Sequence, residues 1–216
     1  MHCRRRHRSN SLFTEAEKVE IMAVVIAVVG AGGKTTRIHK LAEQYRKLGK
    51  KVLVTTTTHM YLEDGCILSG NVEEIIEKLN TCEYCMAGLL EENDPQKMKG
   101  LPQRLYEEVC KYADVVLVEA DGSKGFPVKY PAAHEPVIPD NVTEIHIVMG
   151  LRGIGHPIKD VCHRIDQVLK YLKVTEDTLL TMEHLQRLVE EGYIKPLKKT
   201  YPKVPLKIFF NEYKHC

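Results

Sequence analysis

The sequence predicts an α/β fold, a mostly parallel sheet with helices on both faces, and two observations support this. Short runs of apolar and β-branched residues alternate with stretches of helical periodicity, the pattern of strands buried on both sides and joined by helices. The first strong apolar run, VVIAVV at residues 24–29, leads directly into a glycine-rich turn and then into a helical stretch. The 216 residues are enough for one domain of this kind.

The glycine-rich turn at residues 30–36, GAGGKTT, has the chemistry of a loop that binds nucleotide phosphates. Glycines let backbone N–H groups approach an anion, and Lys34 adds a positive charge. Thr35 adds a hydroxyl suited to Mg²⁺, and the following helix would present its N-terminus to the phosphates. The expected fold is therefore P-loop NTPase-like. The residues expected to hold the nucleotide in this turn are Gly30, Ala31, Gly32, Gly33, Lys34, Thr35 and Thr36.

The spacing of this turn leaves alternatives open. The usual pattern G-x-x-x-x-G-K-[ST] requires a glycine where Val28 stands. The shorter pattern G-x-x-G-K-T-T is close to the loop of Mur-type ATP-dependent ligases, and a plain glycine turn between strand and helix is the structural alternative. A dinucleotide site is disfavoured because Thr35 stands at the third glycine position, and the strand ending at residues 55–58 supplies no acid for a ribose.

The other elements follow from the same periodicities and from turn residues. Gly49 stands where a glycine ends the first helix, and a loop at about residues 122–141 holds four prolines that stiffen it. Long stiff loops beside a sheet are typical of functional sites. Strands are expected at about 23–29, 51–57, 84–89, 115–119, 144–149 and 206–210, and helices at about 35–48, 72–79, 101–112, 159–172 and 182–191.

Two acids, Glu119 and Asp121, follow the apolar run at residues 115–118. Because the carboxyl ends of parallel strands meet at one edge of the sheet, we expect either carboxylate to reach Thr35 and hold Mg²⁺ directly or through water. Lys34, Glu119 and Asp121 are the expected catalytic residues, acting by positioning and charge neutralisation. The structural alternative is an acid that caps a turn.

Further polar residues are placed where a substrate could meet the nucleotide. A threonine-rich segment ends the second strand on the same edge, and its hydroxyls can hold a phosphate or a polar group, although threonine also simply favours strands. The Pro-rich loop carries a His-Glu pair that can move protons, and a glycine-dense turn after residue 149 carries an arginine suited to an anion. The candidate substrate residues are Thr57, Thr58, His59, His134, Glu135 and Arg152.

Asn211 has the position of the asparagine in a guanine-binding N-K-x-D motif, after the last expected strand. The acid that would accept from guanine is replaced by Lys214. We therefore expect Asn211 to contact the nucleotide, and leave the choice between ATP and GTP open.

Composition limits the function classes. The net charge is only +2, which does not indicate a nucleic-acid partner, and no apolar run is long enough to cross a membrane. Seven irregularly spaced cysteines are typical of reduced thiols in the cytoplasm. The pair Cys82 and Cys85 lacks the second pair that a zinc site needs. Residues 1–20 are expected to form a basic arm, and residues 21–216 a single domain.

Several segments occur together in an order that resembles the selenium-dependent hydroxylase accessory proteins of the YqeC-like family. They are GAGGKTT at residues 30–36, TTTTHM at 55–60, EADGS at 119–123, HEPVIP at 134–139, and Gly150-Leu151 with the later His163-Arg164. The resemblance covers about residues 21–211 and implies a nucleotide-binding factor in the maturation of selenium-dependent molybdenum hydroxylases. It implies a molybdopterin-type cofactor and a molybdenum hydroxylase as partners.

The leading expectation is an Mg²⁺-dependent NTPase that acts as such a maturation factor. An ATP-dependent ligase or kinase is the alternative, with His134, Glu135 and Arg152 lining the pocket of a small acceptor. A third interpretation is a nucleotide-controlled switch without turnover, because no residue is evident that would position an attacking water.

Overall fold

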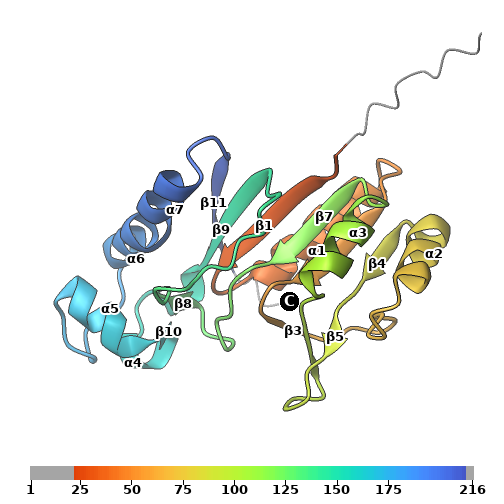
Figure 1. Cartoon of the computed structure of the whole chain (residues 1–216). Helices are drawn as coiled ribbons and strands as arrows, with labels where there is room; N and C mark the ends of the chain where they lie inside the picture. Colours follow the sequence, from red (N-terminus) through yellow and green to blue (C-terminus); the bar gives the residue numbers. More distant parts are fainter. Residues whose placement is uncertain (1–21, 213–216) are drawn as a thin grey trace, which may run out of the picture.

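The structure is a computed structural model that describes residues 22–212 (Figure 1). Its centre is a six-stranded sheet in the order β11-β9-β1-β7-β2-β4, in which every neighbouring pair is parallel. The basic arm expected at residues 1–20 lies outside the described residues. The six strands are β1 (Val24–Gly30), β2 (Val52–Thr56), β4 (Tyr84–Met86), β7 (Val115–Glu119), β9 (Glu144–Gly150) and β11 (Leu206–Asn211).

Helices cover both faces of this sheet, because alternate residues of each strand point to opposite sides. On one face, Ile26 and Val28 of β1 share a core with Ile38 and Leu41 of the first helix. On the other face, the side chain of Ala27 belongs to a larger core that the remaining longer helices close. The predicted fold class is therefore confirmed. The helices are α1 (Lys34–Arg46), α2 (Val72–Cys82), α3 (Gln103–Cys110), α4 (Ile158–Val161), α5 (Ile165–Leu172), α6 (Met182–Val189) and α7 (Lys195–Thr200).

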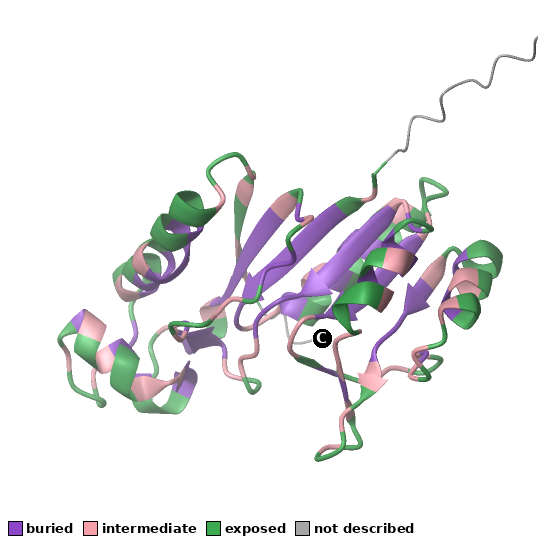
Figure 2. Cartoon of the chain, viewed as in Figure 1, coloured by how far each residue is buried: buried purple, intermediate pink, exposed green. Residues whose placement is uncertain are grey.

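The central strands are buried along most of their length, and the outer surfaces of the helices are exposed (Figure 2). This explains why the strands are continuous apolar runs and the helices are amphipathic. Strand β1 lies between β7 and β9, with Val28 opposite Glu119 and Gly30 opposite Val148. The turn after β1 and the acid that ends β7 therefore lie at the same edge of the sheet.

Two small sheets follow the carboxyl ends of the central strands and flank this edge (Figure 1). One has the order β3-β6-β5 and starts directly after β2, and the other pairs β8 with β10. Their strands are β3 (His59–Tyr61), β5 (Leu89–Leu90), β6 (Lys97–Lys99), β8 (Val128–Lys129) and β10 (Cys162–His163).

The structure differs from the sequence-based expectation in several places, and the strand expected at 84–89 is divided into β4 and β5. The helix expected at 159–172 is two helices separated by β10, and Arg164 has a left-handed backbone with φ 62°. Helix α7 was not expected. The short strands β3, β6 and β8 were not expected either, because strands of two or three residues carry too little alternation to be recognised. No helix among residues 22–212 is long and apolar enough to span a membrane.

Of the two cysteines in the C-x-x-C motif, Cys82 is exposed at the end of α2 and Cys85 is buried in β4. Burial raises the pKa of the Cys85 thiol to about 12, so that it stays protonated near neutral pH. The buried cysteine is therefore a packing residue.

Candidate functional site

The turn between β1 and α1 is held in a conformation that only glycine fits. Gly32 has φ +69°, and a Cβ atom there would lie 2.5 Å from the carbonyl oxygen of Pro127 and 2.7 Å from Cα of Gly150. Gly33 has φ +136° and is the N-cap of α1, where no side chain caps the helix. The first N–H groups of α1 are therefore not capped by the side chain of the N-cap residue, which is the geometry of an anion site at a helix N-terminus.

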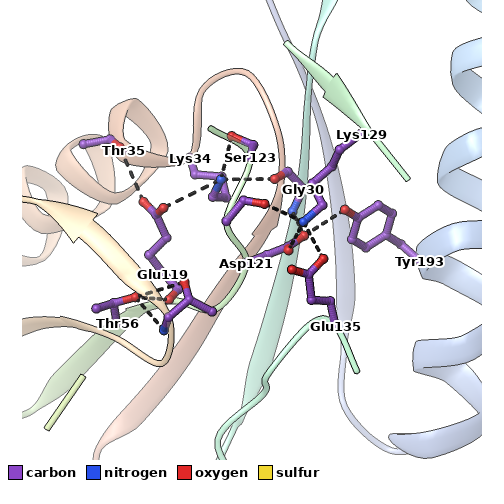
Figure 3. A network of polar contacts seen from close by, with 12 residues as sticks. Gly30, Lys34, Thr35, Thr56, Glu119, Asp121, Ser123, Lys129, Glu135 and Tyr193 are labelled. Carbon is purple, nitrogen blue, oxygen red and sulfur yellow. Dashed lines mark hydrogen bonds and ion pairs between the residues drawn. The ribbon is translucent and has the colours of Figure 1, made fainter. Parts of the chain in front are cut away.

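Lys34, the first residue of α1, turns its side chain back over this turn and is buried. Its ammonium donates to the carbonyl oxygen of Gly30 at 3.1 Å and to the Ser123 hydroxyl at 3.3 Å (Figure 3). The same nitrogen lies 3.7 Å from Oε1 of Glu119. The cation of the turn is thus fixed above the carboxyl ends of β1 and β7.

Glu119, the last residue of β7, is the acid that reaches the turn. Its Oε2 accepts from the Thr35 hydroxyl at 3.4 Å. Burial raises the pKa of Glu119, and the nearby Lys34 ammonium and Thr35 hydroxyl oppose this by stabilising the carboxylate. A hydroxyl and a carboxylate are hard oxygen ligands, the donor set that Mg²⁺ prefers.

Asp121 lies two residues after Glu119 and has a different environment. Its side chain is fully buried and does not line the cavity described below. Oδ2 accepts from the backbone N–H of Gly30 at 3.1 Å and from the Tyr193 hydroxyl at 2.8 Å, and Oδ1 accepts from Lys129 (Figure 3). Because the chain leaves the sheet after Glu119, the alternation of a strand does not place the two acids on one side.

A buried ionic network extends from Asp121 toward the Pro-rich loop. The Lys129 ammonium, which is fully buried, also donates to the carbonyl oxygen of Gly122 at 2.5 Å and to Oε2 of Glu135 at 2.7 Å. Arg164 donates to Oε1 of Glu135 at 2.7 Å. Although burial opposes it, these two cations and a backbone N–H hold the pKa of Glu135 below its ordinary value.

Lys129 and Tyr193 were missed by the sequence analysis. Lys129 carries no motif, and Tyr193 belongs to a π-helical turn, Glu190–Ile194, at the end of α6. The hydrogen bond of Tyr193 to Asp121 joins residues 72 positions apart in the chain. Only the folded chain shows this proximity.

A cavity of about 980 Å³ opens over the turn between β1 and α1. Nearly all the residues that the sequence predicts for a site line this cavity. The exceptions are Gly30, Ala31 and Asp121, which are not among its lining residues. From the expected phosphate and metal residues it includes Gly32, Gly33, Lys34, Thr35, Thr36 and Glu119. From the expected substrate residues it includes Thr57, Thr58, His59, His134, Glu135 and Arg152.

Several of these residues also support the walls. The Thr57 hydroxyl donates to the carbonyl oxygen of Val137 at 2.6 Å, and His59 lies 2.8 Å from the carboxylate of Glu91. The Arg152 guanidinium donates to the carbonyl oxygen of Gly125 at 2.8 Å. The Thr57 and Arg152 contacts tie the segment after β2 and the turn after β9 to the Pro-rich loop, and the His59 contact ties β3 to the segment after β5.

Asn211, at the end of β11, also lines the cavity and supports the turn itself. Its amide nitrogen donates to the carbonyl oxygen of Gly32 at 3.1 Å, and a Cβ atom at Gly33 would lie 2.3 Å from that nitrogen. Lys214, which stands in place of the expected acid, lies outside the described residues.

Among residues 22–212, no group of three or more His, Cys, Asp or Glu side chains could hold a metal ion without further ligands. A metal ion held by Thr35 and Glu119 would therefore complete its coordination with ligand oxygens and water. This is the usual arrangement for Mg²⁺ bound together with phosphates.

Comparison with known proteins identifies the family. A family model described as YqeC protein matches residues 26–166 of this chain. The chain belongs to the YqeC family. A protein of Escherichia coli (strain K12) with the name uncharacterized protein YqeC is 32% identical over 208 residues, which cover 89% of this chain and 77% of that protein. The resemblance seen in the sequence motifs is thus confirmed.

Among solved structures, one match is the crystal structure of signal recognition particle receptor FtsY from Elizabethkingia anophelis. The sequence identity is 20% and the TM-score 0.31, and the match covers 88% of this chain. The chain spans 58% of the FtsY chain.

The part of the chain that matches the YqeC model contains most of the site. The turn after β1, the two acids Glu119 and Asp121, and the ion pair of Glu135 with Arg164 all lie within residues 26–166. Tyr193 and Asn211 lie outside it.

Proposed function

We propose that this YqeC-family chain binds a nucleoside triphosphate together with Mg²⁺ and hydrolyses it as an accessory factor in the maturation of selenium-dependent molybdenum hydroxylases. One observation carries the nucleotide part of the proposal. Lys34, Thr35 and Glu119, from a glycine turn and the neighbouring strand, meet at the floor of one cavity. The maturation role is supported by the family resemblance of the sequence motifs.

The residues present fit a triphosphate. Gly32 and Gly33 let the turn pack closely against Gly150 and Asn211, and the N-terminus of α1 faces the cavity that this turn lines. Lys34 supplies a positive charge that is already oriented by two hydrogen bonds, so that little side-chain freedom is lost on binding. Backbone N–H groups and one lysine are the usual partners of nucleotide phosphates.

The residues also fit Mg²⁺, which would neutralise charge on the phosphates when bound. Thr35 and Glu119 would hold it, and Lys34 would balance the charge that develops on the transferred phosphoryl group. Asp121 acts as a positioning residue in this proposal, because its Oδ2 fixes the N–H of Gly30 where the turn begins. Catalysis then depends on geometry and electrostatics, as is general for phosphoryl transfer.

A second candidate is an ATP-dependent ligase or kinase. It is favoured by one observation: the same cavity continues from the phosphate turn to His134, Glu135 and Arg152, the residues expected to contact an acceptor. The two candidates share the nucleotide site and differ in whether turnover requires a second substrate.

The test uses the purified full-length chain with ATP or GTP, with and without Mg²⁺, and with and without a molybdopterin compound. Calorimetry measures binding, and phosphate release measures turnover. Hydrolysis of nucleotide alone supports the NTPase, and turnover only with the acceptor supports the ligase or kinase. Binding without turnover indicates a switch. Absence of nucleotide binding would overturn all three.

The maturation role needs a separate measurement. The chain and nucleotide are added to a selenium-dependent hydroxylase that lacks its cofactor, together with a source of the cofactor. The proposal predicts that hydroxylase activity appears only with active chain and nucleotide. Equal activation by the Lys34→Ala variant would contradict it.

A further inference from the structure

We propose that Lys124, Arg152 and Arg164 form a second anion site in the cavity, which binds the oxyanion group of an acceptor beside the nucleotide phosphates. This inference rests on the proposed nucleotide site and names the chemical class of the second substrate, a small molecule that carries a phosphate or carboxylate. All three side chains come from segments that line the cavity.

The second site begins where the nucleotide site ends. The Ser123 hydroxyl accepts from Lys34 at 3.3 Å, and Lys124 is the next residue along the chain. Gly150 packs against Gly32, since a Cβ atom at Gly32 would lie 2.7 Å from Cα of Gly150, and Arg152 follows two residues later. The backbone therefore leads from the phosphate turn to both cations within one or two residues.

The wall that carries these cations is built from paired segments. Strand β8 pairs with β10, so that Lys129 lies opposite His163, and the rings of Phe126 and His163 stack with centroids 5.9 Å apart. Arg152 donates to the carbonyl oxygen of Gly125, which ties the turn after β9 to the same wall. An anion at this wall would therefore meet a framework that is already ordered.

Charge is not balanced within this wall. Lys124, Lys129 and Arg164 carry three positive charges, and Asp121 and Glu135 carry two negative charges. The carboxylates pair with Lys129 and Arg164, and Lys124 has no hydrogen-bond or ion-pair partner in the described part of the chain. The exposed Lys124 ammonium is thus available to an incoming anion.

Glu135 orients the Arg164 side chain, so that its guanidinium is in place before an anion binds. Its backbone is left-handed, a conformation that non-glycine residues seldom adopt, and one of its nitrogens donates to Glu135 at 2.7 Å. The planar guanidinium has further N–H groups, which match the geometry of phosphate and carboxylate oxygens. Burial and the charges of Arg164, Lys129 and Lys124 lower the pKa of His163, so that this neighbouring ring stays neutral and can contribute a hydrogen bond.

The experiment begins with the full chain saturated with Mg²⁺ and a non-hydrolysable triphosphate, so that the first phosphate site is filled. Methyl phosphate and, in a separate arm, acetate are titrated and followed by calorimetry. We expect saturable binding of at least one of them, and the two arms show whether the acceptor is a phosphate or a carboxylate. Lys124→Gln should weaken this binding about ten-fold while nucleotide affinity stays unchanged.

A matched control is Lys97→Gln, because Lys97 lines the same cavity from β6, outside the wall formed by β8 and β10, and its loss changes the net charge equally. It should leave the anion affinity unchanged. Arg164→Gln should weaken anion binding as Lys124→Gln does. If that variant unfolds, Lys124→Gln still tests the site, because its side chain is exposed and has no partner to lose among residues 22–212.

Two outcomes would overturn the inference while leaving the proposed function intact. One is no saturable anion binding to the nucleotide-loaded protein, and the other is a loss of nucleotide affinity in Lys124→Gln that equals the loss of anion affinity. If the wild-type chain binds no nucleotide, the proposed function fails separately. Methyl phosphate is then titrated into Lys34→Ala protein, and binding that Lys124→Gln abolishes supports the second site, whereas its absence refutes it.

Discussion

The ammonium nitrogen of Lys34 lies 3.7 Å from a carboxylate oxygen of Glu119, at the carboxyl ends of two neighbouring parallel strands. Both side chains are nearly buried, at 5% and 9% exposure, so their interaction is screened less than a surface ion pair. Lys34 adjoins the phosphate turn and Glu119 adjoins Thr35. This one relationship makes the cavity floor suited to a polyphosphate and its metal ion.

The first prediction concerns Lys34. Lys34→Ala should weaken triphosphate binding by about 1.5–3 kcal/mol, or about 10- to 150-fold in Kd, because a charge-assisted contact to phosphate is lost. Calorimetric titration with ATP and GTP measures this. Lys40→Ala is the matched control, since Lys40 is an exposed lysine of the same helix. An equal loss in both variants would mean that general electrostatic attraction, and no specific site, binds the nucleotide.

The second prediction separates the two acids. Glu119→Gln should abolish the gain in nucleotide affinity that Mg²⁺ provides. It should lower the free energy of unfolding less than Asp121→Asn does, because burial already disfavours the Glu119 charge and raises its pKa. Asp121→Asn should lower that free energy by about 3 kcal/mol, because the buried Lys129 loses a charged partner. Thermal melts would then show Tm lower by roughly 6–12 °C for Asp121→Asn. The reverse pattern would place the metal at Asp121.

The third prediction compares two glycines that share a left-handed backbone. Gly32 has φ +69° and Gly49 has φ +67°. A Cβ atom at Gly32 would clash with backbone atoms of Pro127 and Gly150, whereas a Cβ atom at Gly49 would have no neighbour within 4 Å. Gly49→Ala should cost about 1 kcal/mol of stability and leave nucleotide binding intact. Gly32→Ala should cost about 1–3 kcal/mol more and weaken nucleotide binding. Equal nucleotide affinities in the two variants would show that the turn is not the phosphate site.

The fourth prediction is a pH dependence of stability. His146 is buried in β9, where its Nδ1 accepts from Nε of Arg37 at 3.2 Å and its Nε2 contacts Glu144, so the ring is neutral. Burial lowers the pKa of His146, with Arg37 adding to this effect and Glu144 opposing it. As the pH falls below about 6.5, the unfolded chain binds a proton that the folded chain does not, and stability decreases.

His146→Gln should therefore reduce the loss of unfolding free energy between about pH 7 and pH 5, as measured by urea unfolding. His156→Gln is the control, because His156 is exposed. A His146→Gln profile as steep as that of the wild type would exclude His146 as a source of the acid sensitivity.

The sequence was sufficient for the elements that are defined locally. β1, the glycine turn, α1 and β7 follow from apolar runs, glycine positions and helical periodicity, each within about ten residues. The position of Glu119 near the glycine turn was predictable as well, because the carboxyl ends of parallel strands lie at the same edge of a sheet. These parts needed no knowledge of tertiary contacts.

The orientation of Asp121 could not be obtained in the same way. Its three partners are the N–H of Gly30, Lys129 and Tyr193, which come from three separate segments of the chain. The left-handed Arg164 that divides the expected helix is likewise held by Glu135, 29 residues away. Such long-range polar contacts depend on the assembled fold and have no local signature.

The most direct test is a crystal structure of the full chain with Mg²⁺ and a non-hydrolysable triphosphate. We expect phosphate oxygens against the N–H groups from Gly32 to Thr35. We also expect a metal ion bound by the Thr35 hydroxyl at about 2.1 Å, with Glu119 bound directly or through one water. Phosphates bound away from Lys34, or a metal ion coordinated by Asp121 in place of Glu119, would contradict the proposed nucleotide site.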